Sequence, residues 1–110
     1  MREYPKKTKK LMRELAGQTY EEELRRALIP LSESFDRWKA GSTESWELSE
    51  MIHDFNREPA RKLFVKYDGK MDDLMVASAI AKGILDRKEV PEELLEHLAD
   101  LVEFCEKEMT

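Results

Sequence analysis

The sequence has few cysteines and glycines, the residues that form disulfides and phosphate-binding loops. Its 110 residues include one cysteine, four glycines, four prolines and two histidines. The lone cysteine, Cys105, cannot form an internal disulfide, and such usage is typical of a reducing compartment. The glycines are far apart, whereas a phosphate-binding loop needs several in a short run. We therefore expect a cytoplasmic protein and exclude nucleotide binding through such a loop.

Long apolar runs and a secretory leader are also missing. The longest nearly apolar stretch, residues 74–81, is far shorter than the ~20 residues that a membrane-spanning helix needs. The basic N-terminus is followed by no apolar segment, so it lacks the pattern of a secretory signal. We expect no membrane partner.

The chain is rich in charge. Charged residues make up 39% of it and apolar residues 41%. This balance is typical of surface helices that each have one solvent-exposed face. A chain of this length buries roughly two-thirds of its unfolded surface, which is enough for one domain. The sequence therefore predicts a single helical domain over residues 1–110.

Helical periodicity dominates the chain. Apolar residues recur at steps of three and four through residues 20–38, 48–55 and 94–105, a spacing that predicts amphipathic helices. Gly17, Gly41 and Gly69 are expected to end helices, and Thr19 is expected to start a capping box. Pro30 is expected to kink its helix without breaking it, because the apolar stripe continues in phase on both sides.

One segment has almost no polar face. Residues 74–85 are apolar nearly all round, and a helix of that kind belongs in the middle of a structure. Asp72 and Asp73 precede it and suit the positive end of a helix. The sequence thus predicts an all-α fold, a compact bundle of about five or six helices around a central apolar helix at residues 74–85.

The two ends of the chain carry opposite charge. Residues 1–13 contain six basic side chains and one acidic one, whereas residues 86–110 contain nine acidic and three basic ones. We interpret residues 1–17 as a basic N-terminal arm or short helix, either solvated or lying against the acidic last helix. The alternative is nucleic-acid binding through Lys6, Lys7, Lys9 and Lys10. The net charge of −5 argues against that partner.

A helix predicted over residues 42–56 has two different faces. One is the apolar stripe that a core needs, formed by Leu48, Met51, Ile52 and Phe55. The opposite face and the residues beside it, which we call the outer stripe, consist of Trp46, Glu50, His53, Arg57, Arg61 and Lys62. Three interpretations of this stripe are open. Another part of the chain covers it, a protein partner or second copy contacts it, or it forms a catalytic site. Tryptophan and arginine carry much of the energy of protein interfaces, so we favour the partner.

Glu50 and His53 also have the Glu-x-x-His spacing of a metal-binding helix. Ferritin-like di-iron bundles use this motif twice, together with a glutamate from each of two other helices. Here the motif occurs once, and the residue at the same level of the preceding helix, Glu33, points away from that helix's apolar stripe. Cys105 and His97 lie about a quarter-turn apart, which does not suit a catalytic pair. We expect no metal, no cofactor and no catalysis.

These patterns together predict a small soluble helical interaction or regulatory protein. It is expected to bind another protein or itself, as a homodimer or other homo-oligomer, with the outer stripe as its contact surface. Two alternatives stay open. One is a metal-dependent or hydrolytic enzyme that uses Glu50 and His53, and the other is a nucleic-acid-associated accessory protein that binds through residues 1–17.

Overall fold

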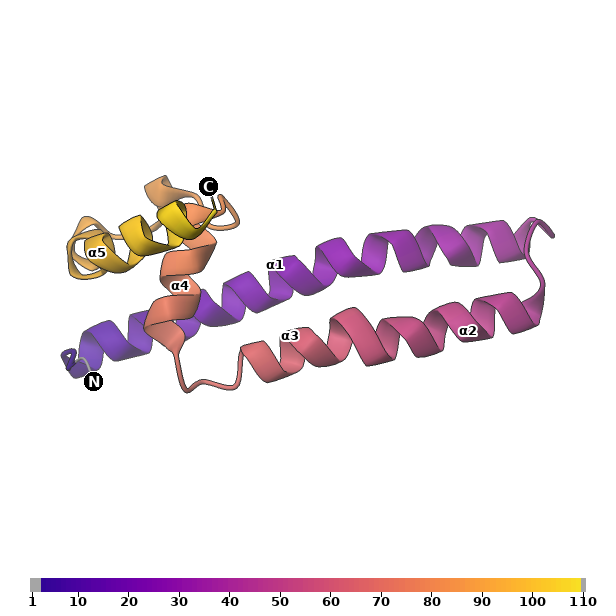
Figure 1. Ribbon diagram of the computed structural model, residues 1–110, viewed down its shortest axis with the longest axis horizontal. Coiled ribbons are helices and arrows are strands. Elements are labelled where there is room, and N and C mark those ends of the chain that lie inside the picture. The colour runs from indigo at the N-terminus through magenta and orange to yellow at the C-terminus, as the bar shows by residue number, and fades with distance from the viewer. Residues whose placement is uncertain (1–2, 110) are drawn as a thin grey trace. The chain divides into compact units, whose positions relative to one another are not determined.

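The computed structural model describes residues 3–109, and within this range the secondary structure is helical, with connecting turns and no strand (Figure 1). The all-α prediction is therefore confirmed. In chain order, the helices are α1 (Lys6–Lys39), α2 (Ser45–Phe55), α3 (Arg61–Lys66), α4 (Asp72–Ala81) and α5 (Glu92–Glu108). A kinked segment, Asn56–Ala60, joins α2 to α3, and a short 3-10 turn, Arg87–Glu89, precedes α5.

The chain divides into two compact units. Unit 1 contains the start of α1, as far as Tyr20, together with the chain from Tyr67 onward. Unit 2 is Glu21–Lys66, which holds the rest of α1 and all of α2 and α3. Helix α1 therefore contributes its first turns to one unit and its last turns to the other.

Unit 1 has a continuous apolar core. Helices α4 and α5 pack against each other, and Val76 of α4 and Leu98 of α5 are fully buried. The first turns of α1 add Met12, Leu15 and Ala16 to the same core. Burial of a whole valine or leucine side chain is worth roughly 1.5–3 kcal/mol, so this core is the main source of stability in unit 1.

Helix α4 is shorter than the predicted apolar helix. It covers Asp72–Ala81 instead of residues 74–85, and its buried residues belong to the core of unit 1. Gly83 follows it in a left-handed conformation (φ 75°), and the Gly83 N–H donates to the Ile80 carbonyl at 3.2 Å. Because an L side chain is disfavoured at that angle, glycine provides the stop. The predicted role of this segment as the centre of the whole fold is not confirmed.

Helix α1 is longer than predicted. Gly17 lies inside it rather than at a helix end, and Thr19 is buried within it rather than capping a new helix. The Thr19 hydroxyl donates to the Leu15 carbonyl at 2.8 Å, which satisfies this hydroxyl inside the helix. The cause is tertiary: Met12, Leu15, Ala16 and Thr19 form one buried stripe, and its packing outweighs the weak helix propensity of Gly17.

Unit 2 is a helical hairpin. The last turns of α1 lie beside the α2–α3 segment and run antiparallel to it (Figure 1), joined by a turn in which Gly41 has a positive φ of 81°. Helix α1 continues through Pro30 without a break, as predicted. At Glu58, one residue before Pro59, the backbone is extended (φ −154°, ψ 132°), so α2 and α3 form a single bent run. The predicted five or six helices around one centre are therefore not confirmed.

Length alone would let α1 cross a bilayer, because its 34 residues rise about 51 Å at 1.5 Å per residue. Its many charged side chains make it too polar to do so. Within residues 3–109, none of the helices combines the length and apolar character of a membrane span.

Candidate protein-interaction surface

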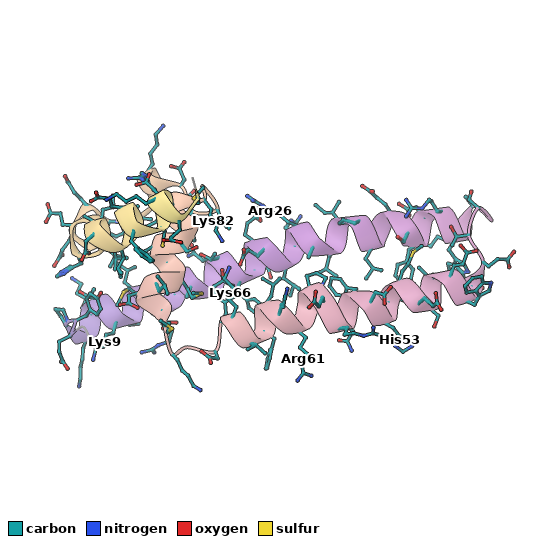
Figure 2. All side chains as sticks on the ribbon, viewed as in Figure 1. Lys9, Arg26, His53, Arg61, Lys66 and Lys82 are labelled. Carbon is teal, nitrogen blue, oxygen red and sulfur yellow. The ribbon has the colours of Figure 1, made fainter. Side chains whose placement is uncertain are left out.

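The outer stripe lies in solvent on unit 2. All six of its side chains are exposed, and Trp46, the second residue of α2, is 63% exposed. Figure 2 shows His53 and Arg61 pointing away from α1. Within unit 2 itself, no other element covers the stripe.

The inner face of α2 explains this orientation. Leu48 is 5% exposed and is the only buried apolar side chain of unit 2. Further along α2, Met51 and Phe55 line a shallow depression together with Ala27 and Leu31 of α1. Because this face turns toward α1, the residues about half a turn away on α2 face solvent. The helical period of the sequence was sufficient to predict which residues share that outward face.

Polar contacts within the outer stripe are few and weak. Lys62 Nζ lies 3.6 Å from Glu58 Oε1, and both side chains are more than half exposed. An ion pair of this kind contributes about 0–1 kcal/mol, because water screens it and both side chains lose rotamer freedom. The chain itself therefore does little to hold these side chains in place.

Glu50 and His53 lie one turn apart on the outer stripe. Both are exposed, and in the part of the chain that the structure describes no three histidine, cysteine, aspartate or glutamate side chains are grouped to hold a metal ion. Cys105 is half-buried against the core of unit 1, where it packs as a small apolar side chain. What Glu50 and His53 can do in this setting is accept and donate hydrogen bonds with a partner.

The basic N-terminal segment is part of unit 1. Lys6, Lys7, Lys9 and Lys10 are exposed on the first turns of α1. Met12, which belongs to the buried side of the same helix, reaches the core. The lysines therefore form the solvated face of an amphipathic helix.

Sequence reasoning missed the exposed apolar side chains of unit 2. Ile29 and Leu28 of α1 are 53% and 42% exposed, and Phe64 of α3 is 71% exposed. A signal for this exposure was present in the spacing of α1. Steps of four and three, the spacing of a helix-bundle seam, relate Leu24, Leu28, Leu31, Phe35 and Trp38. We call these five residues the α1 seam, and the α2–α3 segment covers them only in part.

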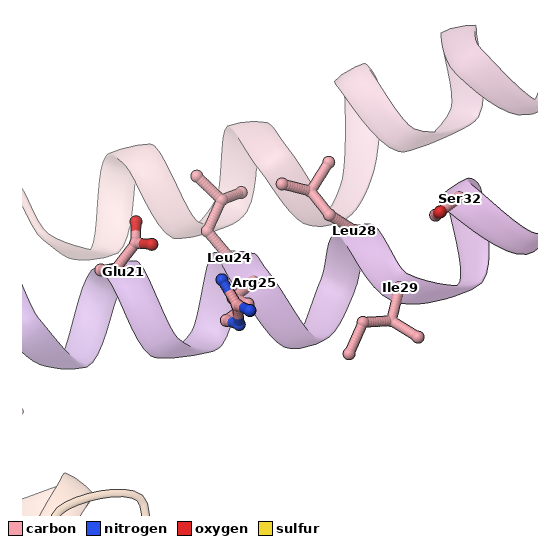
Figure 3. A pocket seen from close by; sticks show the side chains of 6 residues that line it. All are labelled: Glu21, Leu24, Arg25, Leu28, Ile29 and Ser32. Carbon is pink, nitrogen blue, oxygen red and sulfur yellow. The ribbon is translucent and has the colours of Figure 1, made fainter.

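Two shallow, open depressions lie end to end along α1 within unit 2. The first, shown in Figure 3, is lined by Glu21, Leu24, Arg25, Leu28, Ile29 and Ser32. The second is lined by Leu28, Leu31, Ser32, Phe35, Asp36 and Lys39. Because they share Leu28 and Ser32, the two form one continuous surface from residue 21 to residue 39, apolar in the middle and charged at both ends.

No protein-family model, characterised protein or solved structure matches the chain. The candidate surfaces are therefore those that its own exposed side chains define on unit 2: the outer stripe and the depressions along α1.

Proposed function

We propose that this chain is a small helical interaction protein with a regulatory role, which binds another protein or a second copy of itself through unit 2. The observation that carries the proposal is the poor coverage of apolar residues in this unit. Leu48 is buried, whereas Leu28, Ile29 and Phe64 are each more than 40% exposed. Removing apolar surface from water is worth roughly 25 cal/mol per Å², so exposed apolar side chains of this size favour a molecule that covers them.

The small size of unit 2 supports the same proposal. It has 46 residues, from Glu21 to Lys66, close to the roughly 40 residues below which chains usually need disulfides, metals or a partner. Cys105, the only cysteine, lies outside this unit, so no disulfide reinforces it. A partner that covers the exposed apolar residues would supply the burial that the hairpin lacks.

The spacing of the α1 seam favours a helical partner. In helix bundles, residues at steps of four and three from each helix meet in a shared core. Two hairpins of the unit 2 kind together provide the helices of such a bundle. A second copy of this chain is therefore the first partner to test.

The outer stripe supports a second contact, with a different protein. Trp46 gives it a large apolar surface, and Arg57, Arg61 and Lys62 make the rest of it mainly cationic. The matching partner is an acidic protein surface with an apolar hollow for the indole ring.

Sedimentation of the full chain tests self-association. Wild type is expected to rise from the 13.0 kDa of one chain to twice that mass as its concentration increases. Leu28→Ala is expected to move this transition to higher concentration while the chain stays folded, because Leu28 is already 42% exposed. Phe104→Ala is the matched control, since it removes a similarly exposed apolar side chain from unit 1. A wild type that stays monomeric at every concentration would contradict self-association.

The two alternatives make different predictions. Nucleic-acid binding is supported by the exposed lysines at the start of α1, and it predicts an affinity that falls steeply with added salt. The enzyme alternative is supported by the spacing of Glu50 and His53, and it predicts that His53→Ala abolishes metal uptake or activity. In each case the lone cysteine, Cys105, supports a cytoplasmic location.

A further inference from the structure

One side of α1 carries charged and apolar residues in a regular order. At 100° per residue, six side chains of this helix fall within an arc of about 80°. In chain order they are Glu21, Arg25, Leu28, Ser32, Asp36 and Lys39. We call this arc the α1 side face. All six residues are exposed, and together they run the length of the two open depressions along α1.

The charges of the α1 side face are not used within the described chain. Among residues 3–109, no ion pair involves Glu21, Arg25, Asp36 or Lys39. Elsewhere on the same helix such a pair does form, with Arg26 Nε 3.5 Å from Glu22 Oε1. The α1 side face thus offers four charges that a partner could pair.

When two copies of α1 lie antiparallel, the charges that face each other are opposite in sign. Glu21 lies nine residues before Pro30 and Lys39 nine residues after it, so each is about 13–14 Å from that midpoint along the axis. Arg25 and Asp36 lie five and six residues from the midpoint, at about 7–9 Å. An antiparallel pair of α1 helices centred near Pro30 therefore brings Glu21 opposite Lys39 and Arg25 opposite Asp36.

The middle of the same pairing carries no charge. Leu28 and Ser32 lie two residues on either side of the midpoint, so Leu28 of one copy packs over Ser32 of the other. Ile29, which borders the face and is 53% exposed, gains cover from the second helix. A parallel pairing would instead place each charge opposite the same charge of the second copy, which is unfavourable.

We propose that two copies of this chain associate through the α1 side face in an antiparallel, two-fold arrangement, with Glu21 paired to Lys39 and Arg25 paired to Asp36 across the interface. This inference rests on the proposed self-association and specifies its surface and direction. A two-fold interface uses the same patch on both copies, so each pairing occurs twice. The outer stripe, on the other arm of the hairpin, stays available for a different protein.

Charge reversal in the full chain, followed by sedimentation equilibrium, tests the arrangement. Glu21→Lys and Lys39→Glu each turn two attractive contacts into repulsive ones, and each is expected to raise the dimer dissociation constant roughly tenfold. The double variant restores opposite charges and is expected to return to the wild-type dissociation constant. Glu33→Lys is the matched control, because it makes the same charge change on another face of the same helix, and it is expected to have little effect.

The outcomes separate this inference from the proposed function. A wild type that is monomeric at every concentration would overturn both. A wild-type dimer that neither single reversal weakens would overturn only the pairing and leave self-association standing, and so would a double variant that fails to restore the dimer. Arg25→Glu combined with Asp36→Lys repeats the test at the second pair, so the result does not depend on one variant being folded.

Discussion

The Tyr4 hydroxyl donates a hydrogen bond to Asp73 Oδ2 at 3.0 Å and so links two residues that are 69 positions apart. The second carboxylate oxygen, Asp73 Oδ1, accepts the Leu74 N–H at 2.8 Å. The Tyr4 ring also lies edge-on to His97 of α5, with 6.1 Å between ring centroids. Tyr4 therefore connects the residues just before α1 with α4 and α5 inside unit 1.

Tyr4→Phe is expected to lower the free energy of unfolding of unit 1 by about 1 kcal/mol, because it removes this hydrogen bond and keeps the ring. Urea denaturation followed by far-ultraviolet circular dichroism measures the change. Tyr20→Phe is the matched control. The Tyr20 ring lies 5.5 Å from that of Tyr67, but its hydroxyl has no hydrogen bond to another described residue. An equal or larger loss in the control would contradict the importance of the Tyr4 contact.

Thr19→Val is expected to be nearly neutral for stability. The substitution removes a buried hydroxyl and replaces it with a methyl group of similar size, so no cavity forms at this fully buried position. Thr19→Ser keeps the hydroxyl that donates to the Leu15 carbonyl and removes the methyl group, so it is expected to cost about 1 kcal/mol. Thermal unfolding of both variants compares the two. A larger loss in Thr19→Val would mean that the hydrogen bond outweighs the packing.

The pKa of Asp72 gives unit 1 a specific pH dependence. Burial raises the pKa of this carboxyl above its ordinary value, with smaller rises from Asp73 and Asp68, and Arg13 partly opposes the change. Because the folded state holds this proton more tightly than the unfolded state, the Asp72 contribution to stability falls as pH rises from the ordinary pKa through the raised pKa. At neutral pH the ionised carboxylate is therefore destabilising.

Asp72→Asn is accordingly expected to raise the melting temperature at neutral pH. The gain should shrink as the pH falls and vanish below the ordinary pKa, where the wild-type carboxyl is protonated in both states. Melting curves of the two proteins across this pH range measure the difference. A gain of the same size in acid would exclude titration of Asp72 as its cause.

Trp46→Ala is expected to leave the fold almost unchanged and to remove binding at the outer stripe. An indole ring that is 63% exposed contributes little to the folded chain, so the expected loss of stability is within about 0.5 kcal/mol. A pull-down from the lysate of the native host compares wild type, Trp46→Ala and the unit 1 control Phe104→Ala. A protein retained by wild type and Phe104→Ala but lost by Trp46→Ala supports the contact. Equal recovery by all three would contradict it.

Much of the secondary structure could be predicted because apolar spacing is local information. Steps of three and four predicted the helices that became α2 and α5, and the stripe of α5 is buried as expected at Leu94, Leu98 and Val102. Helix ends were harder to predict, because a glycine can lie inside a helix or end it, depending on the residues that pack around it. Gly17 stays helical since the buried residues around it hold α1 together, whereas Gly83 adopts a positive φ and follows the end of α4.

The candidate site, like the helices, could be predicted from the sequence only in part. The sequence was enough to predict that Trp46, Glu50 and His53 share one side of a helix, because that follows from 3.6 residues per turn. It also determined the order of charges on α1. What covers each face depends on how the helices pack: the single buried apolar residue of unit 2 is Leu48, and Leu28 and Ile29 are exposed to water. Periodicity shows which residues lie together, but their burial depends on a neighbouring element that no local pattern encodes.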